Sequence, residues 1–179
     1  GRQEFETWAE RSRDMSRRDD LAVEPRLQVA WSALAMYELD PVRGRETAHE
    51  ALTAGRALGL RDAYANALIT AVDLAVLAGD ADESRSLLTE AREFAATRPS
   101  PWWGLQYDLV EARLLSRAGD QDGAQRLLQG VAAHEMAANR VLQRDLCEAR
   151  AWVALERGRF GEARALAAET VAIDLENGL

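Results

Sequence analysis

The chain has 179 residues, of which 47% are hydrophobic and 29% charged, and this balance excludes a mainly disordered protein. Its formal net charge of −8 argues against binding to nucleic acid or to an anionic membrane surface, because both interactions depend on clustered basic residues. All 22 basic residues are arginines, so neither a phosphate-binding loop with its lysine nor Schiff-base chemistry is available to this segment.

No segment is expected to cross a membrane or to form an internal disulfide. The longest apolar stretch, residues 63–78, is interrupted by Asn66 and Asp73 and is too short to span a bilayer. The sequence has no recognisable signal peptide, and its single cysteine, Cys147, has no partner within the chain. We therefore expect a cytoplasmic protein.

The residue types predict helices from one end of the chain to the other. Ala, Leu, Arg and Glu dominate, and these are strong helix formers. The first amphipathic helix is expected at 3–17, with Phe5, Trp8 and Met15 on one side. Helices of two kinds, A and B, then alternate. The A helices are predicted at 25–38, 62–78, 101–118 and 140–157, and the B helices at 41–58, 81–97, 121–137 and 160–176.

The alternation follows a repeat of about 40 residues. Gly79, Gly119 and Gly158 mark the turns between A and B helices, and Leu39 takes this place before Asp40-Pro41. Five residues after each turn the residue is always small: Gly44, Ser84, Ala124 and Ala163. The period predicts one repeat domain over 1–179, with a leading helix at 1–19 and units at 20–59, 60–99, 100–139 and 140–179.

This pattern resembles the tetratricopeptide repeat over residues 20–178. The shared features are a small residue in the middle of helix A, a turn with glycine and a following polar residue, and small residues five and twelve positions later. The resemblance implies an all-α, right-handed superhelical solenoid of antiparallel helix pairs. The units depart from the family in length, which is usually about 34 residues. They also lack its aromatic residue in helix A, and have in that place Ala35, Ala75, Leu115 and Ala154.

Long units that end like Arg56-Ala57-Leu58-Gly59-Leu60 resemble the repeat regions of large bacterial signal-transducing ATPases and transcription regulators, the maltose-regulator type among them. In such proteins a nucleotide-binding module precedes the repeats and a helix-turn-helix often follows. The resemblance implies that the chain is a fragment of a larger protein, the sensor or interaction region of a multidomain bacterial transcriptional regulator. The exclusive use of arginine, whose codons are GC-rich, agrees with a bacterial source of high GC content.

No catalytic, cofactor or metal site is predicted. His49 and His134 lie on different B helices, without cysteine or carboxylate at ligand spacing. The acidic residues have arginine three or four positions away, which is typical of a solvated helix surface, and no pair of carboxylates is singled out for hydrolysis. Cys147 is expected to pack as a small hydrophobic residue. The sequence therefore favours a protein that is not an enzyme.

Trp102 and Trp103 are adjacent on a predicted helix, so their side chains point about 100° apart. Only one of them can face the core fully. Packing under the connection at 98–100 is favoured for the other, and an exposed anchor for a partner is the alternative.

The resemblance also points to a candidate binding groove, because helix A side chains line the concave surface of tetratricopeptide repeats. Three columns repeat at fixed distances before the turns. They are Arg26, Asn66, Gln106 and Asp145 at thirteen residues, Val29, Ile69, Leu109 and Glu148 at ten, and Ala33, Asp73, Arg113 and Trp152 at six. The outer column is polar and the middle one mostly apolar, as expected for polar clamps beside apolar pockets.

The predicted partner-binding residues are Asn66, Ile69, Asp73, Gln106, Leu109, Arg113, Asp145, Glu148 and Trp152. The alternative is that Asp73 and Arg113 only pair across neighbouring helices. In function, we expect a scaffold that binds a protein, a peptide or a small effector, with no direct contact to nucleic acid or membrane. Self-association into a homodimer through the open terminal units is the second possibility, and a regulatory arm of an enzyme is the third.

Overall fold

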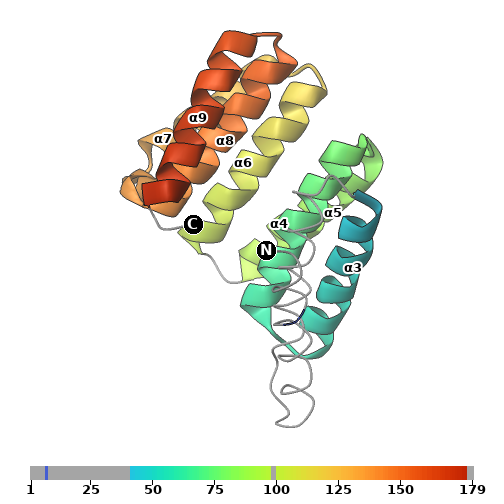
Figure 1. The fold of residues 1–179 in the computed structure, drawn as a ribbon. Coiled ribbons are helices and arrows are strands. Elements are labelled where there is room, and N and C mark those ends of the chain that lie inside the picture. Colours follow the sequence, from blue (N-terminus) through green and yellow to red (C-terminus); the bar gives the residue numbers. More distant parts are fainter. Residues whose placement is uncertain (1–6, 8–40, 98–99, 177–179) are drawn as a thin grey trace. The chain divides into compact units, whose positions relative to one another are not determined.

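The computed structural model describes Thr7, residues 41–97 and residues 100–176, and the regular elements in these ranges are all helices (Figure 1). They are α3 (Pro41–Ala57), α4 (Arg61–Ala78), α5 (Ala81–Thr97), α6 (Pro101–Arg117), α7 (Gln121–Ala133), the 3₁₀ helix η1 (Glu135–Ala138), α8 (Arg140–Glu156) and α9 (Phe160–Glu176). The all-α fold is thus confirmed for the described part of the chain. The helices predicted at 3–17 and 25–38 lie outside it.

The predicted helix boundaries agree to within one residue, with one exception. A single B helix was predicted over 121–137, and this is wrong beyond Ala133, where α7 ends. His134 adopts an extended conformation (φ −73°, ψ 146°), and its Nδ1 atom accepts a hydrogen bond of 3.1 Å from the backbone N–H of Met136. This side-chain cap starts the separate 3₁₀ turn η1.

Glycines in the left-handed backbone region lie at helix ends along the repeat. Gly79, Gly119 and Gly158 follow the A helices and Gly59 follows a B helix, with φ between 66° and 89°. Residues with a Cβ atom are sterically strained at such angles, so glycine can end these helices without that strain. After two of these glycines an aspartate caps the next helix: the Oδ1 atom of Asp80 accepts from the N–H of Glu83 (3.1 Å), and Oδ1 of Asp120 from that of Gly123 (2.8 Å).

The column of small residues five positions after each turn is buried throughout: Gly44, Ser84, Ala124 and Ala163. The column twelve positions after the turn is buried as well: Ala51, Ala91, Val131 and Thr170. The column at nine positions contains one exception, since Ala48, Leu88 and Leu128 are buried whereas Ala167 is exposed. The period therefore locates the core-facing side of each B helix.

The described helices belong to two compact units, residues 1–91 and 92–179. In the first unit α3 packs on α4. Arg45 of α3 pairs with Asp80 (3.4 Å) and with Glu83 of α5. Further along, Arg56 of α3 donates to the hydroxyl of Tyr64 in α4 (2.8 Å). Basic side chains of α3 thus meet acidic ones around the start of α5.

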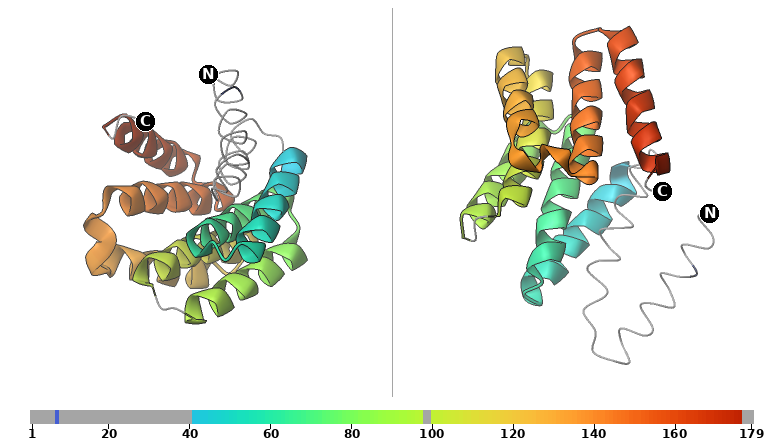
Figure 2. Two further views of the ribbon diagram at one scale, coloured as in Figure 1. Left: turned by 90° about the horizontal axis from the view of Figure 1, so that it is seen from below. Right: turned by 90° about the vertical axis from the view of Figure 1, so that its left-hand side faces the viewer.

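In the second unit α6 packs on both α7 and α8, and α8 packs on both α7 and α9 (Figure 2). Successive A helices are therefore neighbours, and each also contacts a B helix. The core between them consists of Leu105, Leu109, Ala112, Ala124, Leu128, Val131, Leu142, Leu146, Ala149 and Val153. None of the helices within the described ranges is long and apolar enough to cross a membrane.

Candidate functional site

The predicted groove residues are divided between the two units. Asn66, Ile69 and Asp73 lie on α4 in the first unit, and the other six lie on α6 and α8 in the second. On α4, Asn66 is exposed, Ile69 is half-buried and Asp73 is 8% exposed. The second unit contains two successive A helices and so shows whether residues of one column meet.

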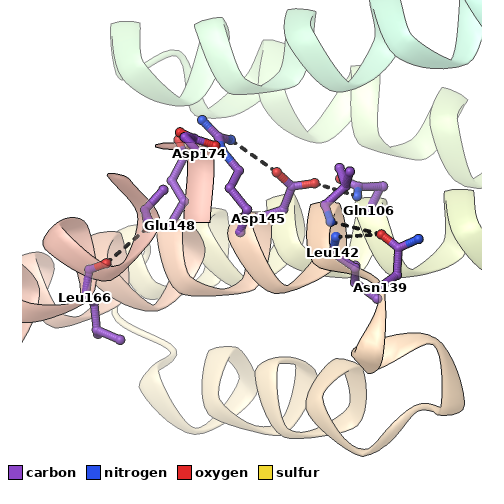
Figure 3. A network of polar contacts seen from close by, with 10 residues as sticks. Gln106, Asn139, Leu142, Asp145, Glu148, Leu166 and Asp174 are labelled. Carbon is purple, nitrogen blue, oxygen red and sulfur yellow. Dashed lines mark hydrogen bonds and ion pairs between the residues drawn. The ribbon is translucent and has the colours of Figure 1, made fainter. Parts of the chain in front are cut away.

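In the outer column, thirteen residues before each turn, the residues of α6 and α8 form a direct hydrogen bond (Figure 3). The side-chain amide of Gln106 in α6 donates to Oδ2 of Asp145 in α8 over 2.8 Å. The two residues occupy the same place in successive units, 39 positions apart. Their contact places equal positions of two successive predicted units side by side.

In the inner column, six residues before each turn, the residues of α6 and α8 form a cation–π contact. The guanidinium carbon of Arg113 in α6 lies 5.3 Å from the ring centre of Trp152 in α8, and both side chains are half-buried. A cation–π contact of this kind contributes about 0.5–2 kcal/mol, depending on how far the pair is desolvated. The Trp152 ring therefore lies against a cation near the C-terminal ends of α6 and α8.

The middle column does not provide the expected pocket. Leu109 is 3% exposed and belongs to the core of the second unit, so the prediction that it lines an open apolar pocket is wrong. Leu105, Leu109 and Ala112 follow one another at helical spacing and together form the buried stripe of α6. Glu148, the α8 member of the same column, remains one-third exposed.

A network around Arg144 was not predicted from the sequence. The guanidinium of Arg144 lies 3.1 Å from Asp145, 2.5 Å from Glu148 and 3.3 Å from Asp174 of α9 (Figure 3). One positive charge thus faces three carboxylates. Arg144 and Glu148 are four positions apart on a predicted helix, and this spacing indicates an ion pair from the sequence alone. Asp174 is on another helix, and only the packing of α9 on α8 brings it close.

Burial raises the pKa of the Asp145 carboxyl above its ordinary value. The hydrogen bonds from Gln106 and Arg144 act in the opposite direction, while the nearby charge of Glu148 adds to the increase. Its ionised form is therefore less well stabilised than that of a solvated carboxylate. Another cation at this place would favour the ionised form.

We name Gln106, Arg113, Asp145, Glu148 and Trp152, together with Arg144 and Asp174, the α6–α8 face. On α8, Asp145, Glu148 and Trp152 follow one another at three and four positions and so share one side of the helix. Five of the seven residues belong to the predicted columns. The arrangement offers partly desolvated carboxylates for cationic groups at one end and an aromatic ring at the other.

The remaining sequence predictions have mixed outcomes. Cys147 is 6% exposed, and burial raises the pKa of its thiol, with Glu169 contributing, so its prediction as a packed residue is confirmed. Trp102 and Trp103 are both half-buried, and Trp102 packs against the core of the second unit. Neither tryptophan is a fully exposed anchor.

The histidines and the other acidic clusters are held by local partners. The Nε2 atom of the exposed His49 lies 3.1 Å from Glu83. Arg92 contacts Asp108 and Glu111 at 2.5 Å each, so this carboxylate pair faces a guanidinium. In the part of the chain that the structure describes, no three His, Cys, Asp or Glu residues are grouped as a metal site would require.

Comparison of the chain with protein-family models, with curated proteins and with solved structures found no match in any of the three. The resemblance to tetratricopeptide repeats accordingly stays a prediction from the sequence.

Proposed function

We propose that the chain is a binding scaffold of helical repeats and that its second unit holds a protein or peptide segment on the α6–α8 face. The observation that carries this proposal is the meeting of two predicted columns, Gln106 with Asp145 and Arg113 with Trp152. All four residues occupy groove positions that the sequence predicts. Their contacts, each between residues 39 positions apart, support a continuous surface over successive A helices.

The packing within the second unit supports a tetratricopeptide-like solenoid of antiparallel helix pairs. An A helix, α6, contacts its own B helix, α7, and the next A helix, α8, and α8 contacts its own B helix, α9, as well as the preceding α7. In such an array each helix pair covers the apolar side of the next one, and side chains of successive A helices form a row. A row of this kind is a surface that an extended or helical segment can follow.

The chemistry of the face favours a basic partner segment. Three carboxylates share the single guanidinium of Arg144, which leaves an excess of negative charge on half-buried groups. A lysine or arginine side chain of a partner would compensate this excess with charge-assisted hydrogen bonds. Trp152 offers the kind of aromatic contact that often dominates the binding energy of an interface.

A selection experiment tests the proposal without knowledge of the natural partner. Random short peptides displayed on phage are selected on the purified chain, and the binding of the enriched peptides is measured by calorimetry. We expect enrichment of lysine and arginine. Trp152→Ala is expected to weaken binding by about 1–3 kcal/mol, as at an interface hot spot. Leu58→Ala serves as the matched control, because Leu58 is an exposed apolar residue of the first unit.

The outcome is decided by two comparisons. Peptides without an excess of basic residues, or peptides that bind the Trp152→Ala variant as tightly as the unchanged chain, contradict the α6–α8 face as the binding surface. Equal loss of binding in the Leu58→Ala variant would show that the effect is not specific to this face.

We further propose that the parent protein is a multidomain bacterial transcriptional regulator. The support for this is the resemblance of the long units to the repeat regions of such proteins. The test is to read the gene on both sides of this segment. A lysine-containing phosphate loop upstream and a basic helix-turn-helix downstream support the proposal, and a gene that encodes neither contradicts it.

A further inference from the structure

Side chains connect the turn that follows α6 to the turn that follows α8. Arg157, at the end of α8, donates from Nε to the side-chain oxygen of Gln121 in α7, and from Nη2 to the backbone oxygen of the same residue over 2.7 Å. The Gln121 amide donates to the backbone oxygen of Ser116 in α6 over 2.9 Å, and its oxygen accepts from the Ser116 hydroxyl over 3.2 Å. We name Ser116, Gln121 and Arg157 the turn bridge. It joins the C-terminal ends of α6 and α8.

The turn bridge is not a general property of the repeat. It joins unequal positions of two units, whereas the predicted columns join equal ones. Arg157 directly precedes a turn glycine, and the two preceding glycine turns have Ala78 and Ala118 at this place. At the place of Gln121 the preceding unit has Ala81. Alanine has no polar side-chain atom, so these bonds depend on the particular residues of α6, α7 and α8.

The turn bridge lies close to the contact between Arg113 and Trp152. On α6, Arg113 precedes Ser116 by three residues, and on α8, Trp152 precedes Arg157 by five. These spacings correspond to about 5 Å and about 8 Å along a helix. The cation–π contact and the turn bridge therefore connect the same two helix ends. A change in the separation of these ends alters the distance from Arg113 to Trp152.

The carboxylate end of the α6–α8 face is farther from the turn bridge. Gln106 and Asp145 lie seven residues before Arg113 and Trp152, which is about 10 Å along each helix. Their own hydrogen bond of 2.8 Å connects α6 and α8 there. Loss of the turn bridge should therefore disturb the aromatic end of the face and leave the carboxylate end in place.

We propose that Arg157 is a positioning residue of the α6–α8 face: through Gln121 it holds the ends of α6 and α8 where Trp152 lies against Arg113, and it thereby sets the affinity of the aromatic end for a partner. This inference rests on the proposed function of the face. The planar guanidinium suits the role, because it donates to two oxygens of one residue in a fixed geometry.

Fluorine NMR of the chain labelled with 5-fluorotryptophan tests the positioning of Trp152 without any partner. The chain has five tryptophans, and the Trp152 resonance is the one that Trp152→Phe removes. Arg113→Ala takes the cation away from the ring and provides the reference shift. We expect Arg157→Ala and Gln121→Ala to move the Trp152 resonance in the same direction. Circular dichroism shows whether each variant keeps its helices.

Two features of the variants exclude a simple effect of charge. Gln121→Ala opens the turn bridge without changing any charge. Arg159→Ala is the matched control, because Arg159 lies in the same turn as Arg157 but pairs with Glu162 of α9 at 2.8 Å. This control should leave the Trp152 resonance and the affinity for peptides unchanged.

A double-mutant cycle tests the link from Arg157 to binding. The probe is a basic peptide selected on the unchanged chain, and calorimetry measures its affinity. Arg157→Ala should weaken binding about three- to tenfold, as for residues coupled in one contact network. Combined with Trp152→Ala, the same substitution should have an effect of less than about twofold, because the ring through which it acts is absent. Combined with Asp145→Asn, it should keep its full effect.

The outcomes separate this inference from the proposed function. A shifted Trp152 resonance together with a non-additive cycle supports the inference. An unchanged resonance in the Arg157→Ala and Gln121→Ala variants overturns it, and so do additive effects of Arg157→Ala and Trp152→Ala on binding. If Trp152→Ala alone leaves the affinity unchanged, the proposed function fails and the link from Arg157 to binding fails with it. A shifted resonance would then still assign the position of the Trp152 ring to Arg157.

Discussion

Helices α7 and α9 hold the same place in successive units, yet they meet solvent in different ways. The exposed positions of α7 include Gln125, Arg126 and Gln129, whereas α9 exposes Phe160, Val171 and Leu175. Helix α7 is contacted by the A helix before it and by the one after it. The comparison teaches that the period locates the apolar sides of a B helix, while the neighbouring helices decide which of these sides are covered.

The largest effect is expected where the two helices differ most in burial. Leu128 of α7 is 2% exposed, and Leu128→Ala should reduce the free energy of unfolding by about 2–5 kcal/mol, as for other buried leucines. Ala167 is the corresponding residue of α9 and is exposed, so Ala167→Leu should change stability by no more than about 0.5 kcal/mol. Urea denaturation of both variants at low protein concentration measures the difference. Similar losses in the two variants would contradict the comparison.

The column of small residues allows a finer test. Ala124 of α7 is 0% exposed and Ala163 of α9 is 9% exposed. Enlarging Ala124 to leucine should overpack the helix crossing and cost about 1–3 kcal/mol. The same replacement of Ala163 should cost less, because one side of α9 can yield toward solvent. Thermal melting measures the stability of both variants. A greater loss of stability in the α9 variant than in the α7 variant would contradict this expectation.

The ion network that holds α9 on α8 should have a smaller effect. Arg144→Ala leaves three carboxylates without their shared cation and should cost about 1 kcal/mol, since the side chains are partly exposed and screened. Arg140 is the control: it pairs with Glu176 between the same two helices but is about half exposed. Chemical denaturation at low and high salt should show a larger loss for Arg144→Ala, and salt should reduce that loss by a smaller fraction, because the Arg140 pair is more exposed and more strongly screened. Equal losses would mean that the network does not fasten α9.

The smallest effect concerns the pH dependence of the α6–α8 contact. The raised pKa of Asp145 means that the folded chain holds this proton more tightly than the unfolded chain. The stability of the unchanged chain should therefore fall, relative to the Asp145→Asn variant, as pH rises from the ordinary aspartate value of 3.8 through the raised pKa. Urea denaturation of both proteins at several pH values measures this difference. A difference that grows in the opposite direction would indicate a lowered pKa.

The sequence predicted the helices well because their end signals are local. Gly79 and Gly119, with an aspartate after each, specify a left-handed end and the next cap within two residues. The end of α7 was missed, since the cap formed by the His134 ring is not a common stop signal and nothing else distinguishes residues 134–137 from a continuing helix.

The candidate site was only partly predictable. The columns that the tetratricopeptide resemblance indicates placed Gln106 near Asp145 and Arg113 near Trp152, because stacked units bring equal positions together. The contacts themselves were not predicted. Leu109 was assigned to the wrong side, since a leucine fits an open pocket and a core stripe equally well. The approach of Asp174 to Arg144 depends on how α9 lies across α8, a packing detail that no spacing within one helix specifies.

The glycine–aspartate junctions have a consequence for how the length of such a chain can change. Gly79-Asp80 and Gly119-Asp120 are the same dipeptide, with the same backbone turn and the same cap on the third residue beyond it. Removal of residues 80–119 would join Gly79 directly to Asp120 and restore an identical junction, and duplication of this segment would do so as well. Gain or loss of one whole period therefore leaves every local signal intact, whereas a shift of a few residues separates the turn from its cap. A gene of this kind can lengthen or shorten in steps of one repeat by recombination between equivalent junctions.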